Sequence, residues 1–454
     1  MDNWQFDWLA SCGCRGNEIP EKIFNVKDFG AVGDGVADDT SAIQKALDAC
    51  ENAGGGKVTF PPGVFLCGSL FIGNDTEFNL PRGSTIWGSQ KIEDYKTIFT
   101  RAAGIETQWP AALLNAIGKH NVVISGTGTL DGRGKIFWDD FWERTNNYFS
   151  PNGLRWAADY ECRRPRGILI QDCTDVTIRE LVIYRAGFWS VHVLYSKYVT
   201  VDDLCIFNNI EGHGPSTDGI DIDSSEYIEV ANCRIDCNDD LICLKAGRDA
   251  DGLRVNRKTE FVYIHDCSAG LGAGVITFGS ETSGTISNVL AERITACGAG
   301  AGVAFKSCTI RGGGVHDVYL QDISVDYCWH TILFSLNWFP EYSCPKLPES
   351  FRDKEIPELW KVMTAKVDPE KGIPVFKNLH FRNITGTRNR DWGLWLQSAP
   401  QIPVTDVTME NCLISGYRAG ILEYGGNWQL KNVRFSDYEF PFDIKDTFGK
   451  IEQE

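Results

Sequence analysis

Three aspartates in the middle of the chain have the residue types and the spacing of a carboxylate cluster. Asp218 stands in Ser-Thr-Asp-Gly, and Asp239 and Asp240 follow 21 and 22 residues later in Asn-Asp-Asp. Crowded carboxylates do not all ionise together, so one keeps a proton to donate while another accepts one. An acid and a base of this kind are typical of glycoside hydrolysis. The cluster forms only if about 22 residues of chain return to the same place.

A repeated strand pattern predicts that return. Asp-Val-Thr-Ile from Asp175 and Tyr-Val-Thr-Val from Tyr198 are two of its copies, and successive anchor residues are separated by 23, 29, 34 and 28 residues in different parts of the chain. The apolar positions alternate with period two and no long helical segment interrupts them. The intervals are shorter than the roughly 40 residues of a propeller blade. The sequence therefore predicts an all-β parallel β-helix whose coils stack about 4.8 Å apart.

Both ends of such a solenoid need a cover, because open coil edges expose unpaired backbone groups. An amphipathic helix with apolar Ile43, Ala46, Leu47 and Cys50 follows the N-cap residues around Asp38. We expect it to cap the first coil. Residues 1–22 are then an N-terminal extension and 23–454 a single catalytic domain, with a loop insertion at about 329–375 beside the cleft.

Bulk composition narrows the possible partners. A net charge of −17 disfavours nucleic acid, and the lack of an 18-residue apolar run argues against a membrane span. Many of the 16 cysteines, such as Cys233, Cys267 and Cys412, fall at inward strand positions, and we expect mostly free, buried thiols. Cys12 and Cys14 either pair or lie in a disordered end. The start Met-Asp-Asn-Trp lacks the regions of a signal peptide. We expect a cytoplasmic protein, or a periplasmic or extracellular one if a leader has been removed; the oligomeric state stays open.

The chain also resembles a known family. The segment 24–40 looks like the opening module of pectin-degrading right-handed β-helices, and 163–314 resembles glycoside hydrolase family 28, the polygalacturonases and rhamnogalacturonan hydrolases. The resemblance implies a right-handed β-helix, a pectic polysaccharide as substrate, and no cofactor or metal. It makes Asp239 the general acid, and Asp218 and Asp240 the carboxylates that hold and deprotonate a water, with inversion at the sugar carbon.

Two departures from the family pattern concern the sugar on the leaving-group side of the cleaved bond, in subsite +1. Gly272-Ala273-Gly274 stands where the family has Gly-His-Gly, and Ala304-Phe305-Lys306 where it has Arg-Ile-Lys. An arginine fork holds a carboxylate by two charge-assisted hydrogen bonds, and Ala304 lacks it. We therefore expect a neutral sugar such as rhamnose in +1. A galacturonate in −1, on the other side of the bond, would be held by Lys245, Lys306 or Arg311.

Other substrate-binding candidates are more weakly marked. His213 precedes the Asp218 turn, Arg164 lies in the coil before the catalytic ones, and Arg248 is a possible replacement for the missing arginine. Trp329 lies in the insertion, where an aromatic ring can stack on a sugar or merely pack the loop. A polygalacturonase acting on homogalacturonan, a calcium-dependent pectate lyase and a noncatalytic carbohydrate-binding β-helix remain as alternatives, and the sequence leaves endo or exo action open.

Overall fold

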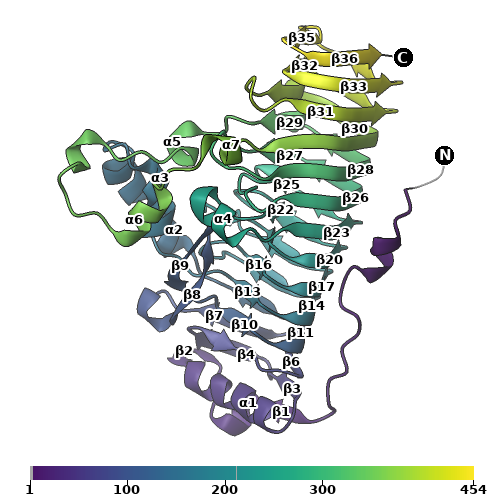
Figure 1. Cartoon of the computed structure of the whole chain (residues 1–454). Helices are drawn as coiled ribbons and strands as arrows, with labels where there is room; N and C mark the ends of the chain where they lie inside the picture. Colours follow the sequence, from purple (N-terminus) through teal and green to yellow (C-terminus); the bar gives the residue numbers. More distant parts are fainter. Residues whose placement is uncertain (1–3, 211, 454) are drawn as a thin grey trace.

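The computed structural model describes residues 4–210 and 212–453 and shows one long solenoid of parallel strands (Figure 1). Three columns of strands form its faces. The first column carries the candidate site and consists of β5 (Leu70–Phe71), β10 (Leu114–Ile117), β13 (Ile168–Gln171), β16 (Val191–Leu194), β19 (Ile220–Asp223), β22 (Ile242–Lys245), β25 (Gly274–Phe278), β27 (Ala301–Lys306), β29 (His330–Ser335) and the end of β30 (Val375–Gln397).

The other two columns follow the same order. The second contains β1 (Ile23–Asn25), β3 (Gly56–Thr59), β6 (Thr76–Asn79), β11 (His120–Ser125), β14 (Thr174–Arg179), β17 (Lys197–Asp202), β20 (Glu226–Ala231), β23 (Thr259–His265), β26 (Ile286–Cys297), β28 (Gly314–Asp326), β31 (Val404–Glu410), β33 (Gly425–Lys431) and β36 (Phe448–Gln453). The third contains β2 (Asp34–Asp38), β4 (Gly63–Cys67), β7 (Ser84–Gly88), β12 (Thr129–Asp131), β15 (Val182–Tyr184), β18 (Cys205–Phe207), β21 (Arg234–Asp236), β24 (Ser268–Ala269), β32 (Leu413–Glu423) and β34 (Arg434–Ser436). In the second column β30 lies between β28 and β31. The ends of β26 and β28 and the middle of β30 continue the third column between β24 and β32, and the end of β32 pairs with the end of β30 in the first. β35 (Asp443–Lys445) pairs with β32, and β8 (Thr97–Ala102) with β9 (Ile105–Pro110) in a separate antiparallel pair.

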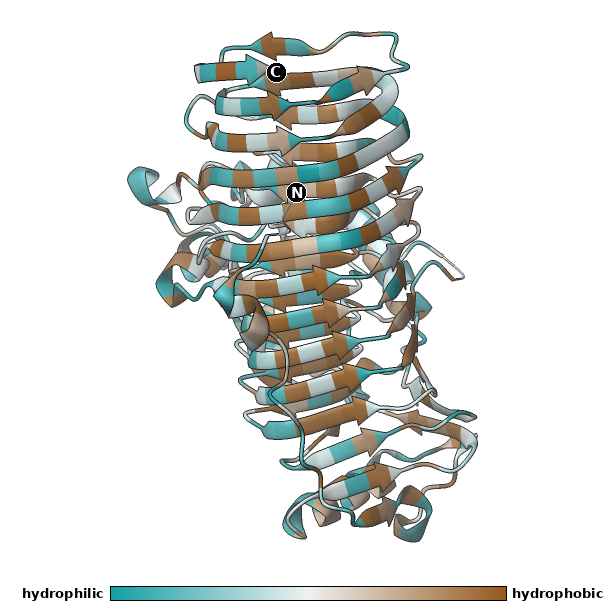
Figure 2. Ribbon diagram, turned by 90° about the vertical axis from the view of Figure 1, so that its right-hand side faces the viewer, coloured by the Kyte–Doolittle hydropathy of each residue, from teal (hydrophilic) through white to brown (hydrophobic). Residues whose placement is uncertain are grey.

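The predicted right-handed parallel β-helix is confirmed, and its register follows from burial. Along strands of the second column, such as β17 and β20, the residues alternate between the core and the outside, and Figure 2 shows alternating brown and teal segments. Strands of the first column, such as β19 and β22, are buried at every position. Ile220 aligns with Ile242 and Ile242 with Ile276, and all three side chains are buried. The rings of Phe278, Phe305 and Phe334 stack on successive coils, 4.7 and 4.5 Å apart. Because a one-residue slip would turn every core side chain outward, this packing fixes the register.

The expected capping helix is α1 (Thr40–Asn52). It buries Ile43, Ala46, Leu47 and Cys50 against the first coils, as its apolar pattern predicts. Asp39 accepts hydrogen bonds from the backbone N–H groups of Val32 and Gly33, which tie the preceding turn to the helix start.

The N-terminal segment packs along the outside of the solenoid (Figure 1). A row of rings from Tyr198, Tyr227 and Phe261 stacks on successive coils of the second column at 5.1 and 4.8 Å. Trp8 contacts Phe261 at 5.9 Å, and the Arg15 guanidinium lies 4.1 Å from the centre of the Tyr198 ring. The segment therefore covers part of this aromatic row.

Two insertions project together from one side of the solenoid (Figure 1). The first carries α2 (Lys135–Arg144), a π-helical turn (Thr145–Phe149) and α3 (Arg155–Glu161), and the second carries α5 (Pro340–Ser343), α6 (Glu358–Met363) and α7 (Pro369–Gly372). They share an apolar cluster in which the rings of Trp156 and Trp360 meet at 5.2 Å. α4 (Asp249–Val255) lies between β22 and β23 and contacts α6.

In the described ranges every cysteine is a free thiol, including Cys12 and Cys14. None of the helices among residues 4–210 and 212–453 is long and apolar enough to cross a bilayer.

Candidate active site

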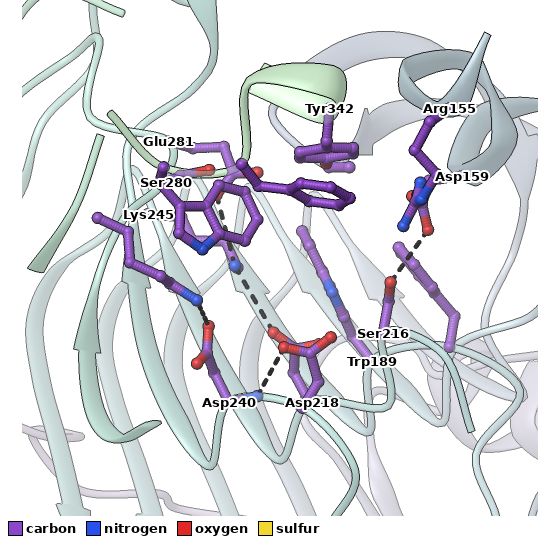
Figure 3. A pocket seen from close by; sticks show the side chains of 16 residues that line it. Arg155, Asp159, Trp189, Ser216, Asp218, Asp240, Lys245, Ser280, Glu281 and Tyr342 are labelled. Carbon is purple, nitrogen blue, oxygen red and sulfur yellow. Dashed lines mark hydrogen bonds and ion pairs between the residues drawn. The ribbon is translucent and has the colours of Figure 1, made fainter. Parts of the chain in front are cut away.

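A hollow lies above the first column of strands, where the two insertions meet the solenoid. Figure 3 shows Asp218 and Asp240 at its base, with Arg155 and Tyr342 opposite them. The residues that line it come from the coil turns and from both insertions: Ala103, Arg155, Asp159, Phe188, Trp189, Ser216, Asp218, Asp239, Asp240, Lys245, Ser280, Glu281, Lys306, Trp338, Phe339 and Tyr342. We refer to it as the catalytic hollow.

The coil register brings the three predicted aspartates together. Gly219 N–H donates to the Asp240 carbonyl oxygen at 2.9 Å, so the turn before β19 lies directly on the turn before β22. Carboxylate oxygens of Asp218 and Asp240 lie within 4.8 Å of each other. The Oδ1 atom of Asp218 is buried and has no hydrogen-bond partner among the described residues. Two carboxylates at this separation can hold one water between them.

Lysines balance part of this negative charge. Lys306 Nζ donates to Asp240 Oδ2, while Asp240 Oδ1 accepts from Gly274 N–H at 3.1 Å and from Thr277 Oγ1 at 3.0 Å. Lys245 Nζ lies 3.6 Å from Asp218 and 3.5 Å from Asp221. It also lies 3.5 Å from Glu281. Lys245 therefore holds three carboxylates, and Lys306 holds Asp240.

The three carboxylates differ in their affinity for protons. Burial, and then the nearby charges of Asp221 and Asp239, raises the pKa of Asp218 well above its usual value. Burial and Asp240 likewise raise the pKa of Asp239. Burial opposes ionisation of Asp240 too, but Lys306 and Lys245 overcome it and lower the pKa of that carboxyl. Asp240 is therefore the ionised member, whereas Asp218 and Asp239 both tend to keep a proton.

The same cluster is poorly suited to a metal ion. Asp218, Asp240 and Cys243 are close enough to share a cation. However, Lys306 already pairs with Asp240 and Lys245 lies beside Asp218, and burial raises the pKa of the Asp218 carboxyl and of the Cys243 thiol well above their usual values. A cation here would face two positive charges and a protonated thiol.

A second hollow opens on the other side of Asp239 and Asp240, toward the C-terminal coils. Its lining is mostly small, aliphatic or aromatic: Asp239, Asp240, Ala273, Gly274, Gly300, Ala301, Ala304, Lys306, Trp329, His330, Leu333 and Trp338. None of these described lining residues is an arginine, and the one ammonium group, on Lys306, is bonded to Asp240. We refer to it as the plus-side hollow. Trp329, a candidate from the sequence, lines it and is 49% exposed.

Four other predicted binding residues do not line either hollow. Arg164, Arg248 and Arg311 are almost wholly buried. Arg164 pairs with Asp159 at 2.8 Å, while Arg248 and Arg311 both pair with Asp249, at 3.2 and 2.7 Å. These arginines support the walls and do not point into the hollows.

His213 is also displaced from the hollows. It is exposed, and its ring stacks on Trp142 at 5.4 Å while its Nδ1 lies 3.1 Å from Asn238 Oδ1. Its contacts connect the turn before Asp218 with the first insertion.

Arg155 is the main lining residue that the sequence reasoning missed. It comes from α3, and its Nη1 donates to Asp159 Oδ2 at 2.8 Å. Its guanidinium also lies 5.4 Å from the Tyr342 ring of the second insertion. The repeat spacing does not predict how an insertion folds back onto the solenoid. The only signal in the sequence was a basic residue within an interruption of the strand pattern, shortly before Arg164.

Comparison with known proteins agrees with this geometry. Residues 88–352, more than half of the chain, match the family described as Glycosyl hydrolases family 28. The chain belongs to this family of glycoside hydrolases and is a pectin-degrading hydrolase.

Individual relatives are distant. The chain is 27% identical over 416 residues to a probable polygalacturonase of Vitis vinifera, which covers 89% of this chain and 76% of that protein. It is 26% identical to an exo-poly-alpha-D-galacturonosidase of Dickeya chrysanthemi over 73% of this chain and 61% of that protein. Among solved structures, an exopolygalacturonase from Thermotoga maritima superposes with a TM-score of 0.78 at 24% identity and 94% coverage of both chains. The structural likeness supports the fold.

Proposed function

We propose that this chain is an inverting hydrolase of α-linked galacturonides that accepts galacturonate in −1 and a neutral sugar such as rhamnose in +1. The observation that carries the proposal is the lining of the plus-side hollow, which has no arginine among its described residues. A carboxylate placed there would meet one ammonium group, that of Lys306, which is already bonded to Asp240. The other basic side chain of the lining, His330, has a pKa that burial lowers.

The plus-side hollow instead suits an uncharged sugar face. The outward floor runs from Ala304 to Leu333 on the next coil, since these residues are in register between β27 and β29. Trp329 and Trp338 add aromatic rings to its rim. Apolar and aromatic surface of this kind packs against the C–H groups of a sugar, and a methyl group such as that of rhamnose adds to the contact.

The catalytic hollow offers cations for a galacturonate in −1. Arg155, Lys245 and Lys306 all line it. Arg155 shares Asp159 with Arg164, and these two guanidinium groups lower the pKa of Asp159 to about 2 although burial opposes the shift. Arg155 is thus held by a firmly ionised partner through Nη1. Its remaining N–H groups can serve a carboxylate.

The proton affinities suggest a division of work. Asp239 has a raised pKa and is half-buried at the junction of the two hollows, so it can donate a proton to the glycosidic oxygen. Asp240 is ionised and can take a proton from a water that it shares with Asp218. Because the pKa of Asp218 is raised, Asp218 positions the water, and Asp240 is the better general base.

The second candidate is a polygalacturonase acting on homogalacturonan. It is favoured by relatives named for that activity in Vitis vinifera and Dickeya chrysanthemi. In that case a galacturonate would have to bind in +1 without an arginine fork.

Relative kcat/KM on two sets of oligosaccharides tests the proposal. Both sets carry galacturonate at the non-reducing end and have equal length; one has rhamnose and the other galacturonate in +1. A missing charge-assisted pair is worth about 1.5–3 kcal/mol, so we expect the rhamnose set to be favoured by roughly ten- to a hundredfold. Equal or higher kcat/KM on the homopolymer would overturn the proposal.

A matched pair of variants tests the cause of the preference. Ala304→Arg should raise kcat/KM on the homopolymer, whereas Ala304→Gln, which adds similar bulk without charge, should not. Equal effects of the two substitutions would show that the absent charge at this position does not set the preference.

A further inference from the structure

The coils at and beyond the plus-side hollow carry a group of aromatic and arginine side chains, three of them exposed and three half-buried. We call this group, Tyr327, Trp329, Arg390, Trp392, Tyr417 and Arg418, the arginine-aromatic surface. We propose that it binds the part of the polysaccharide that extends beyond +1, with aromatic rings against sugar faces and arginines on galacturonate carboxylates. This inference rests on the proposed function in one respect, namely that the polysaccharide leaves the catalytic hollow toward the C-terminal coils.

The surface continues the cleft coil by coil. Trp329 lines the plus-side hollow, and Asp391 N–H donates to the Trp329 carbonyl oxygen at 3.2 Å, which places the turn around Arg390 on the next coil. Trp392 is then in register with Arg418 on β32, one coil further. A polysaccharide that leaves +1 along the solenoid axis would pass over the turns around Trp329, Arg390 and Arg418 in that order.

Three rings of this surface are exposed. Tyr327, Trp329 and Tyr417 are 51%, 49% and 42% exposed. Other large rings of the described chain are buried, among them Trp109, Trp138 and Trp428. Contiguous exposed aromatic surface marks an interaction site more often than an isolated ring does.

The arginines are presented on these rings. The Arg390 guanidinium lies 4.9 Å from the Tyr327 ring centre and 4.7 Å from that of Trp329. Its Nη2 donates to the Gly298 carbonyl oxygen at 3.1 Å, and no carboxylate pairs with it within the described part of the chain. The Nε atom of Arg390 is buried and has no hydrogen-bond partner among the described residues. Stacking on aromatic rings holds a guanidinium in place while its remaining N–H groups stay available for a carboxylate.

Arg418 repeats the arrangement on the following coil. It lies 4.9 Å from the Trp392 ring centre and 5.6 Å from that of Tyr417, with only a loose 3.7 Å contact to Asp391. The chain as a whole carries a net charge of −17. Arginines held on these rings add positive charge beside the plus-side hollow and therefore favour an anionic polysaccharide over a neutral one.

The order of charges along the cleft also fits an alternating polymer. Cations line the catalytic hollow, the plus-side hollow lacks arginine, and Arg390 follows one coil later. Galacturonate, a neutral sugar and galacturonate again would meet these three environments in turn.

The test is the dependence of kcat/KM on substrate length. Oligosaccharides share the same non-reducing end and are extended one residue at a time on the reducing side. We expect kcat/KM of the parent enzyme to rise with length, and the rise to be reduced about tenfold or more in Arg390→Gln and in Arg418→Gln, because each loses a charge-assisted contact. The disaccharide, which reaches only +1, should be cleaved by both variants within about twofold of the parent.

A matched control is available on another face. Arg234 on β21 is exposed and lies 5.8 Å from the Phe207 ring centre, a similar arginine-on-aromatic contact away from the cleft. Arg234→Gln should leave the whole length series unchanged. Added salt should reduce the length gain of the parent most and that of the two cleft-side variants less, since salt screens exposed charges and each variant keeps one of the two arginines.

Three results would overturn the inference: a parent enzyme with no length gain, variants that keep the full gain, or variants impaired equally at every length. The first two are also expected if the surface contacts another protein instead. Failure of the proposed +1 preference is a separate outcome, because the length series can be measured on whichever backbone the enzyme cleaves.

Discussion

Replacing Asp239 by asparagine exchanges one carboxyl oxygen for an amide nitrogen. This substitution should abolish catalysis without lowering the stability of the fold. The Asp239 Oδ1 atom accepts a hydrogen bond from Asp240 N–H at 3.0 Å, which an asparagine Oδ1 can also accept. An amide cannot donate the acid proton to a poor leaving group. A positioned general acid accelerates the reaction about 10²–10⁴-fold, so we expect kcat to fall by about 10²-fold or more.

The same substitution should leave the fold equally or more stable at neutral pH. Burial and Asp240 raise the pKa of Asp239, so the folded state binds more protons than the unfolded state between the two pKa values. Stability from this group is therefore present at low pH and declines as pH rises through the folded pKa. Asp239→Asn removes that decline, and its melting temperature at neutral pH should match or exceed the parent value.

The assay is the initial release of reducing ends, together with thermal unfolding across pH. Asp203→Asn is the control, because Asp203 is exposed and has a left-handed backbone (φ 50°) that asparagine also adopts. It should change neither activity nor melting temperature. Activity of Asp239→Asn within tenfold of the parent, or a clear loss of stability at neutral pH, would refute the assignment.

Further predictions concern charge, metal and the N-terminal segment. Lys306 lowers the pKa of Asp240, so Lys306→Gln should move the acidic limb of the kcat/KM profile to higher pH while Lys306→Arg moves it less; an unmoved limb in the glutamine variant would contradict this role. Activity should survive a chelator without forming unsaturated sugars, whereas a calcium-dependent lyase would lose it. Trp8→Ala should lower the melting temperature, because an aromatic pair such as Trp8 with Phe261 is worth about 0.5–1.5 kcal/mol. The same variant should leave kcat unchanged, and a changed kcat would indicate a link between the N-terminal segment and the cleft.

The sequence predicted those parts that depend on the repeat. A 22-residue interval placed Asp218 on the coil next to Asp240, and the apolar pattern around Ile43 located the capping helix. Both features follow from local periodicity, so they could be derived without a structure.

The parts that depend on how insertions fold could not be derived in this way. Arg155 reaches the catalytic hollow from α3, whereas Arg248 and Arg311, chosen for charge and position, are buried against Asp249. Whether an arginine faces a cleft or a buried carboxylate depends on tertiary packing, which the spacing of a solenoid does not encode.

The stereochemistry of the first product tests the account most directly. Proton NMR on fresh product from an α-linked substrate follows the anomer before mutarotation mixes the forms. Direct attack by the water between Asp218 and Asp240 predicts that the β-anomer is released first. Initial release of the α-anomer would require a covalent intermediate and would contradict the roles given to all three aspartates.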